Sequence, residues 1–437
     1  MGRYKNNQKT FYITTLGCPK NTADSMHMQK SLLTEGLRLA DSPENSDFHL
    51  VNTCTFIQSA NEETIETILE AGNIKRNKKN KLIVVGCFAE RYGEIIGKEL
   101  PEVDYYWGTK NFKEAGNLIK KSFPNEFHLS RLEDSKLKET FNTKPYTFVK
   151  ISDGCNRDCH FCIIPKIRGK FRDTPEEDII QDCKEALVRG AKEICLVSQD
   201  SVFYGKSNEL LYNLIQKITD LPGLELLRFL YLYPDKKTLK LLDVFKTNPK
   251  IVPYLESPLQ HVSENLLKAM NRTGSYTFFK DLFLKAREIP GLEIRTSFIL
   301  GYPGETSKDV DEIIRFVTDL KPEKLALFSF SPQEGTVAYN LKDVISDKEI
   351  AKRVNLVRNV HLELLKEIHQ KRIGKIYNCI VDEISEGTII ARRFQDAPEI
   401  DEVVYLESDL ALKPGDIGSV KIESFSEYDM DGVWISE

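Results

Sequence analysis

The chain has 437 residues, of which 41% are hydrophobic and 29% are charged, so two or three well-cored domains are expected. No apolar run approaches the roughly 18–20 residues that span a bilayer, and the polar start from Met1 to Gln8 lacks the apolar segment of a signal peptide. Nine cysteines, an odd number, argue against a secreted disulfide framework and favour metal binding in a reducing cytoplasm.

Residues 1–125 alternate strand and helix signals, with short apolar runs at 11–16, 48–51, 82–85 and 103–107. This pattern predicts βαβ units and a parallel sheet with helices on its faces. A cysteine follows each of the first three runs, at Cys18, Cys54 and Cys87. Neighbouring parallel strands lie about 4.8 Å apart, so loops from their carboxyl ends can bring the three thiols together. The alternative is that these cysteines are small buried core residues.

Residues 126–144 are polar and aperiodic, which predicts a linker. Residues 145–370 resume the alternation, with strands expected at 146–151, 193–198, 226–232, 251–256, 293–300 and 324–330, and a long polar helix at 347–372. Six such units predict an α/β domain built as a partial (β/α)6 barrel, with its active site at the carboxyl ends of the strands.

Residues 371–437 contain five short β-rich runs separated by turns, which predicts a small β-barrel of the oligonucleotide/oligosaccharide-binding type. This segment carries seven Lys or Arg against fifteen Asp or Glu, a local net charge of −8. Such a module repels phosphate backbones and favours a basic protein partner. A solvated surface without a partner is the alternative.

Three further cysteines, Cys155, Cys159 and Cys162, have the spacing CxxxCxxC directly after the first expected barrel strand. Thiolates suit iron–sulfur clusters or zinc. Zinc would need a tetrahedral set, and the neighbouring His160 is poorly placed to complete one. Three thiolates leave one iron of a 4Fe-4S cluster open, whereas four would close it for electron transfer. We therefore expect an open cluster here, and a second one at Cys18, Cys54 and Cys87.

The Cys155 loop resembles the signature of the radical S-adenosylmethionine (SAM) enzymes. Nearly the whole chain resembles the methylthiotransferases, through Leu-Gly-Cys-Pro-Lys-Asn at 16–21, the motif at 154–169, Pro-Leu-Gln-His at 258–261, Gly-Tyr-Pro-Gly-Glu-Thr at 301–306 and a closing TRAM-type β domain. The Cys-Pro-Lys-Asn element and residues 392–401 are similar to the branch that modifies an aspartate of ribosomal small-subunit protein twelve. Met26 and Glu402 depart from that branch's usual residues.

The resemblance implies two 4Fe-4S clusters and two uses of SAM, one supplying a methyl group and the other a radical. The radical would take hydrogen from the aspartate β-carbon, and sulfur held at the N-terminal cluster would be inserted. It also implies a basic ribosomal partner docked through the acidic C-terminal domain, an external electron donor and a sulfur source. A cytoplasmic monomer without membrane attachment would suffice.

Residues expected to contact SAM are chosen by their places at or after barrel strands: Gln199, Asp200, Gln260, Arg295, Gly301 and Gly304. Arg295 could meet the SAM carboxylate. The alternatives are ordinary capping or core hydrogen bonds, and for Arg295 a structural ion pair. His261 is expected to be structural, and Cys183, Cys195 and Cys379 to be buried, unligated thiols.

Two other functions remain open. A methylthiotransferase acting on a modified adenosine of transfer RNA would have to dock an acidic module on its anionic substrate. An iron–sulfur carrier or electron-transfer protein would not need an open iron at both sites or a β/α barrel.

Overall fold

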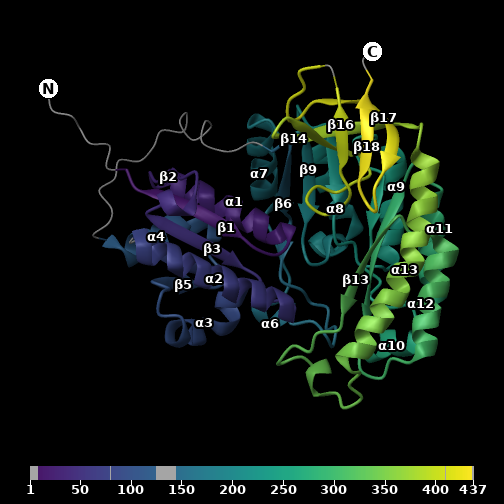
Figure 1. The fold of residues 1–437 in the computed structure, drawn as a ribbon, viewed down its shortest axis with the longest axis horizontal. Helices are drawn as coiled ribbons and strands as arrows, with labels where there is room; N and C mark the ends of the chain where they lie inside the picture. The colour runs from purple at the N-terminus through teal and green to yellow at the C-terminus, as the bar shows by residue number, and fades with distance from the viewer. Residues whose placement is uncertain (1–7, 79, 125–143, 409, 436–437) are drawn as a thin grey trace. The chain divides into compact units, whose positions relative to one another are not determined.

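The computed structural model describes residues 8–78, 80–124, 144–408 and 410–435 (Figure 1). The chain divides into two compact units: residues 1–142 with 163–170, and residues 143–162 with 171–437. Residues 163–170, which fall within the predicted core domain, belong to the N-terminal unit. The predicted linker lies outside the described residues, except for Lys144. No helix among the described residues is long and apolar enough to cross a membrane.

The N-terminal unit is built on a five-stranded parallel sheet in the order β2-β1-β3-β4-β5. Its strands are β1 (Thr10–Thr15), β2 (Arg38–Leu39), β3 (Phe48–Thr53), β4 (Lys81–Gly86) and β5 (Tyr105–Trp107). Its helices are α1 (Pro19–Thr34), α2 (Gln58–Lys78), α3 (Cys87–Glu99), α4 (Ala115–Ser122) and the short α6 (Ile164–Ile167). The predicted parallel α/β sheet is confirmed, and β2 is an additional edge strand.

Helices cover both faces of this sheet because alternate strand residues point to opposite sides. On one face, Leu50 and Ile83 pack with Leu32 of α1 and Ile119 of α4. On the other face, Val51 and Val84 pack with residues of α2 and α3, including Ile68 and Ile96. The sheet order makes β1, β3 and β4 neighbours. Because these strands are parallel, their carboxyl ends share one edge of the sheet.

In the second unit, six parallel strands follow one another in chain order, each followed by a helix. The strands are β6 (Tyr146–Lys150), β9 (Glu193–Val197), β10 (Leu226–Phe229), β11 (Tyr254–Glu256), β12 (Glu293–Leu300) and β13 (Lys324–Ser329). The intervening helices are α7 (Glu176–Val188), α8 (Asn208–Thr219), α9 (Lys236–Thr247), α10 (Glu264–Ala269), α11 (Tyr276–Arg287) and α12 (Ser307–Leu320). An isolated parallel bridge pairs Leu227 of β10 with Ile251, which precedes β11 in the chain, and so brings the two three-stranded sheets together. This confirms the predicted partial (β/α)6 barrel. A two-residue ribbon of β7 (Ser152–Asp153) and β8 (Arg172–Asp173) was not predicted.

Helix α13 (Asp347–Arg372) leads from this barrel into a small closed β-barrel in the order β14-β15-β16-β18-β17. Its strands are β14 (Ile376–Ser385), β15 (Thr388–Arg393), β16 (Val404–Glu407), β17 (Ile417–Phe425) and β18 (Met430–Trp434). The predicted five-stranded C-terminal barrel is confirmed. Buried ion pairs join it to the larger barrel: Arg392 contacts Glu193, and Arg393 contacts Glu293 at 2.8 Å.

Candidate functional site

Cys18, Cys54 and Cys87 lie at the carboxyl ends of β1, β3 and β4. The register pairs Thr15 with Asn52 and Thr53 with Gly86, so the three following loops leave the sheet side by side. Cys18 caps α1 and Cys87 begins α3. The N-terminal end of a helix stabilises a nearby thiolate. The sheet thus gathers the three predicted thiols at one edge.

Charges on these thiols affect one another's pKa. Burial, together with negative charge on Cys18 and Cys87, raises the pKa of Cys54 to about 12. Burial opposes ionisation of Cys18 as well, but Lys20 and Arg168 hold the pKa of that thiol below its ordinary value. A bound cation would relieve the repulsion among three thiolates at this place.

Glycines allow the loops to approach closely. Gly17 has φ +90°, and a Cβ there would lie 2.7 Å from the Cβ of Cys54. Gly86 has φ +93°, and its Cβ would lie 2.5 Å from Oδ1 of Asn52. Any side chain at either position would combine backbone strain with a clash.

Side-chain amides tie the loops to one another. Asn21 donates through Nδ2 to the carbonyls of Leu16 at 2.8 Å and Thr53 at 3.1 Å. Asn52 donates to the Asn21 carbonyl at 2.9 Å. The Thr53 hydroxyl donates to the carbonyl of Val85 and accepts from the Phe88 amide at 3.2 Å. These buried hydrogen bonds fix the thiol-bearing loops.

Arg168 completes this site from a distant part of the sequence. Its guanidinium donates to Asp24 Oδ2 at 2.7 Å, Asn21 Oδ1 at 2.9 Å and Cys87 Sγ at 3.4 Å. Sequence reasoning missed this residue, because its position six places after Cys162 suggested that it belonged to the other cysteine loop. Its hydrogen bonds and its membership of the N-terminal compact unit place Arg168 beside Cys87.

The second set, Cys155, Cys159 and Cys162, lies on the loop after β6 and β7 in the other unit, and all three are partly exposed. The amide of Arg157 donates to Cys155 Sγ at 3.3 Å, and Arg272 Nη1 donates to Cys159 Sγ at 3.6 Å. Burial raises the pKa of Cys155. Sequence reasoning did not single out Arg157 or Arg272, since neither falls at an expected strand end.

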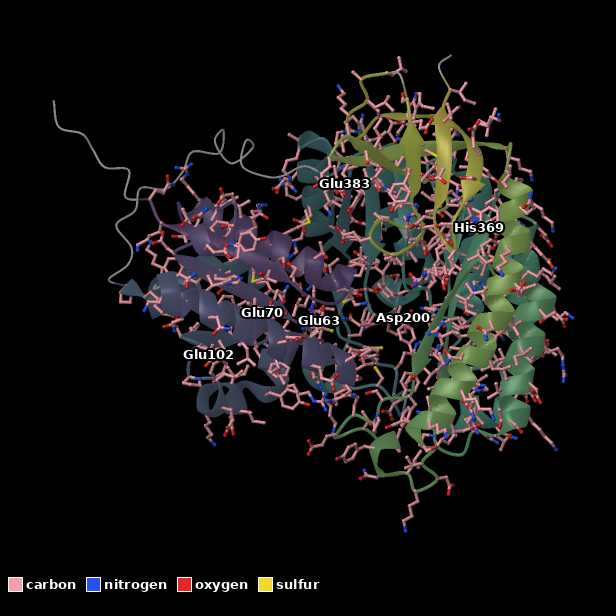
Figure 2. The ribbon with its side chains drawn as sticks, viewed as in Figure 1. Glu63, Glu70, Glu102, Asp200, His369 and Glu383 are labelled. Atoms are coloured by element: carbon pink, nitrogen blue, oxygen red, sulfur yellow. The ribbon has the colours of Figure 1, made fainter. Side chains whose placement is uncertain are left out.

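Arg157 anchors this loop to the carboxyl ends of the barrel strands. Its guanidinium donates to Asp200 at 2.9 Å and Asp235 at 2.7 Å, and it lies 3.6 Å from the centre of the Tyr233 ring. Asp200 follows β9 (Figure 2). The cysteine loop therefore lies at the end of the barrel where active sites of this architecture form.

Three of the residues predicted to contact SAM offer buried oxygens to a ligand. Gln199 Oε1, Asp200 Oδ1 and Gln260 Oε1 have no hydrogen-bond partner among the described residues. Buried polar atoms are normally paired, and these atoms lie after barrel strands, the places where an amino group of a ligand would be bound. These three hydrogen-bond acceptors therefore fit the amino group of SAM, and the assignment of these contacts stays a prediction.

The other three predicted SAM residues have different surroundings. Arg295 lies near the amino end of β12, where it donates to Asp401 at 2.7 Å and lies 3.8 Å from Glu256. This geometry favours the structural ion pair over a SAM contact. A Cβ at Gly301 would lie 2.4 Å from Cγ1 of Ile350, which gives this glycine a packing role. Gly304 has open space around it.

Cys183, Cys195 and Cys379 are buried, and burial raises the pKa of Cys183 to about 12. His261 accepts at Nδ1 from the amides of Val262 and Ser263, each at 2.9 Å, just before α10. These contacts satisfy local backbone groups at a helix start.

A site that could hold a single metal ion would bring several ligating side chains close together. Among the described residues, no three His, Cys, Asp or Glu side chains form a group fit for a single metal ion. In a 4Fe-4S cluster each thiolate binds a different iron, so the thiols stand farther apart than the ligands of a single metal ion.

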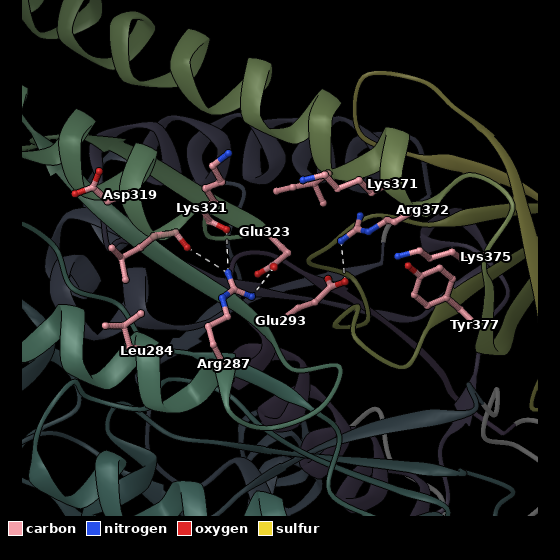
Figure 3. Close-up of a pocket in the computed structure, with 12 residues that line it drawn as sticks. Leu284, Arg287, Glu293, Asp319, Lys321, Glu323, Lys371, Arg372, Lys375 and Tyr377 are labelled. Atoms are coloured by element: carbon pink, nitrogen blue, oxygen red, sulfur yellow. Dashed lines mark hydrogen bonds and ion pairs between the residues drawn. The ribbon is translucent and has the colours of Figure 1, made fainter.

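A pocket of about 460 Å³ lies between α11, α12, α13 and β14 (Figure 3). Its Arg287 and Arg372 already pair with Glu323 and Glu293, and it lies at the amino ends of β12 and β13.

Comparison with known proteins agrees with this architecture. Residues 10–108 match uncharacterized protein family UPF0004, residues 149–317 the radical SAM superfamily, and residues 373–435 the TRAM domain. A ribosomal protein uS12 methylthiotransferase RimO of Leptospira biflexa is 60% identical over 98% of this chain and 97% of its own length. The chain belongs to the uS12 methylthiotransferase family.

More distant relatives of this methylthiotransferase family extend the match. A RimO protein of Thermoanaerobacter sp. is 35% identical over 97% of this chain and 99% of its own length. Among solved structures, the radical SAM methyltransferase TsrM of Kitasatospora setae superposes with a TM-score of 0.56 at 12% identity, covering 76% of this chain and 77% of that one. That likeness shows the fold alone. Membership of the radical SAM superfamily implies an iron–sulfur cluster and SAM.

Proposed function

We propose that this protein methylthiolates an aspartate of ribosomal protein uS12, using one 4Fe-4S cluster at each three-cysteine site. The observation that carries the two-cluster proposal is the N-terminal site itself. Three adjacent strand ends deliver three thiols, two at helix starts, and Asn21, Asn52 and Arg168 hold their loops in place. A protein that only carried electrons would not need three-thiolate sites with an open iron.

At the second site, the bound cluster and SAM would supply the radical chemistry. The residues of this chain orient and shield it. Arg157 fixes the cysteine loop through Asp200 and Asp235. Gln199, Asp200 and Gln260 present oxygens to the SAM amino group, while Arg295 serves as a structural residue and is left out of the proposed contacts. Gly304, with open space beside it, lets a ligand approach the backbone.

The substrate proposal rests on the names of the relatives and on charge. Relatives at 60% and 35% identity over almost the full chain are named for uS12. The segment 371–437 carries a net charge of −8, which complements a basic ribosomal protein and repels transfer RNA. We further propose that the enzyme acts in the cytoplasm with an external reductant and an external sulfur source.

Mass spectrometry of uS12 from cells with and without this gene tests the function. We expect a methylthio group on one aspartate that is missing in the deletion strain and restored by the wild-type gene. Unmodified uS12 in both strains, together with loss of a methylthioadenosine from transfer RNA, would instead establish the RNA substrate.

Docking through the acidic domain can be tested separately. Glu383, Glu386 and Glu407 are exposed in the C-terminal barrel; Figure 2 labels Glu383. We expect the triple change to Gln to weaken uS12 binding about three- to tenfold at low salt, with a smaller effect at high salt because ions screen exposed charges. The matched control is the triple Gln variant of Glu63, Glu66 and Glu70, exposed acidic residues of α2. Equal effects of both variants would contradict docking at the C-terminal barrel.

A further inference from the structure

The guanidinium of Arg168 is buried beside the N-terminal thiols, with only 3% of the residue exposed. Its Nη2 donates to Cys87 Sγ and to Asn21 Oδ1, and its Nη1 donates to the carboxylate of Asp24. Asp24 is fully buried as well. A charge in such a dry environment acts on its neighbours far more strongly than the same charge in water.

The segment that carries Arg168 is anchored to the N-terminal unit by other contacts too. Ile163 and Ile167 pack with Cys87, and the Thr109 hydroxyl donates to the Ile167 carbonyl at 3.3 Å. The position of Arg168 is therefore fixed by the backbone of α6 as well as by its own hydrogen bonds.

Hydrogen bonds to the sulfur ligands and the net charge around an iron–sulfur cluster set its reduction potential. A cationic donor to Cys87 favours the more negative, reduced cluster. The carboxylate of Asp24, on the other side of the guanidinium, opposes this effect. The two residues therefore act on the site with opposite signs.

We propose that Arg168 is a positioning residue of the Cys18, Cys54 and Cys87 site, which orients Cys87 and raises the reduction potential of the cluster bound there. Asp24 holds the guanidinium in place and limits the size of that increase. This inference rests on the proposed function, because it takes the three cysteines as cluster ligands. A single short segment then carries both Cys162, a ligand of one site, and Arg168, whose charge sets the reduction potential at the other.

The test uses the full chain with Cys155, Cys159 and Cys162 all changed to Ala, so that only the N-terminal cluster is measured. After anaerobic reconstitution with iron and sulfide, a redox titration followed by electron paramagnetic resonance gives the potential. For Arg168→Met we expect the ratio of reduced to oxidised cluster at a fixed potential to fall about tenfold, a shift of ~59 mV for one electron. For Asp24→Asn we expect a shift in the opposite direction, and for Arg168→Lys an intermediate value.

Arg272→Met in the same background is the matched control. In the unmodified chain its guanidinium contacts Cys159 of the other unit, and nothing joins it to the N-terminal thiols among the described contacts, so the potential of the N-terminal cluster should not change. Melting of the cluster-free chains checks folding. If Arg168→Met fails to fold, the nearly isosteric Asp24→Asn variant carries the test by the sign of its shift.

Each outcome decides the matter. Opposite shifts for Arg168→Met and Asp24→Asn support the inference, as does loss of the cluster from folded Arg168→Met when Arg168→Lys still binds it. Unchanged potentials, or shifts in the same direction, overturn the inference and leave the proposed function intact. Absence of iron from the parent chain would overturn the ligand assignment of the proposed function and, with it, this inference.

Discussion

Gly17 illustrates how single residues determine the N-terminal site. Its φ of +90° is a conformation that residues with a Cβ rarely adopt, and a Cβ there would meet Cys54 at 2.7 Å. The strand-end glycine thus serves both the turn out of β1 and the close approach of two thiol-bearing loops. A larger residue would have to push one of these loops away.

We expect Gly17→Ala to lower the iron content of the N-terminal site by at least half, because the displaced Cys54 can no longer ligate properly. Iron is measured per chain in the variant that lacks Cys155, Cys159 and Cys162. Gly190→Ala is the matched control: Gly190 also has positive φ, at +105°, but open space lies around its Cβ position. Full iron loading of Gly17→Ala would show that the loops do not need this close contact.

Residue types and spacing predicted both cysteine sets, because thiol chemistry is specific and the strand pattern was strong. They could not predict Arg168, whose contacts depend on where α6 packs. They placed Arg295 among the SAM contacts, whereas its position near the amino end of β12 and its hydrogen bond to Asp401 favour a structural ion pair. Its partner Asp401 lies more than a hundred positions away, and no periodicity in the sequence connects the two.

Among the elements, β12 and the C-terminal barrel are joined by buried charges. Arg295 donates to Asp401, whose side chain is only 1% exposed. Arg393 contacts both Glu293 and Asp396, and Lys324 contacts the same two carboxylates at 2.5 and 3.1 Å. Removing one partner from such a pair leaves an uncompensated buried charge.

We expect Arg295→Met to destabilise the chain by about 3–5 kcal/mol, because it leaves Asp401 buried without its cation. SAM affinity should stay within about twofold of the parent, since Arg295 lies near the amino end of β12. Calorimetric melting and equilibrium SAM binding are the two measurements. Restored stability in Arg295→Met combined with Asp401→Asn would confirm the pair, whereas a large loss of SAM affinity at unchanged stability would return Arg295 to the SAM site.

Across the whole molecule, buried carboxylates make stability depend on pH. Burial raises the pKa of Glu402 to about 7, although Lys324 opposes the shift. The folded protein therefore binds this proton more tightly than the unfolded chain, where the pKa is about 4.3. The sign follows from linkage: the contribution of Glu402 to stability falls as pH rises from about 4.3 to about 7.

Glu402→Gln removes this titration. We expect variant and parent to melt at the same temperature near pH 4.5, and the variant to be more stable above pH 7, by on the order of 3–4 kcal/mol. Melting temperatures across this pH range check the expectation. A constant gap at every pH would mean that Glu402 does not titrate in this window.

The three-part architecture could be predicted from the sequence because each part has its own pattern of strand and helix signals. The first has alternating strands and helices, the second has six such units, and the third has short β-runs separated by turns. The division into compact units did not follow. Residues 163–170 join the N-terminal unit, and the C-terminal barrel joins the larger barrel. These associations depend on buried ion pairs such as Arg392 with Glu193, whose members are far apart in sequence.

The central claim is that the two cysteine sets have different tasks. The most direct measurement follows two products of one reaction with the Cys54→Ala variant: methylthiolated uS12 by mass spectrometry, and 5′-deoxyadenosine from SAM cleavage. We predict that deoxyadenosine is still formed while methylthiolation is lost, whereas Cys159→Ala abolishes both. Unaltered methylthiolation by Cys54→Ala would contradict the two-site account.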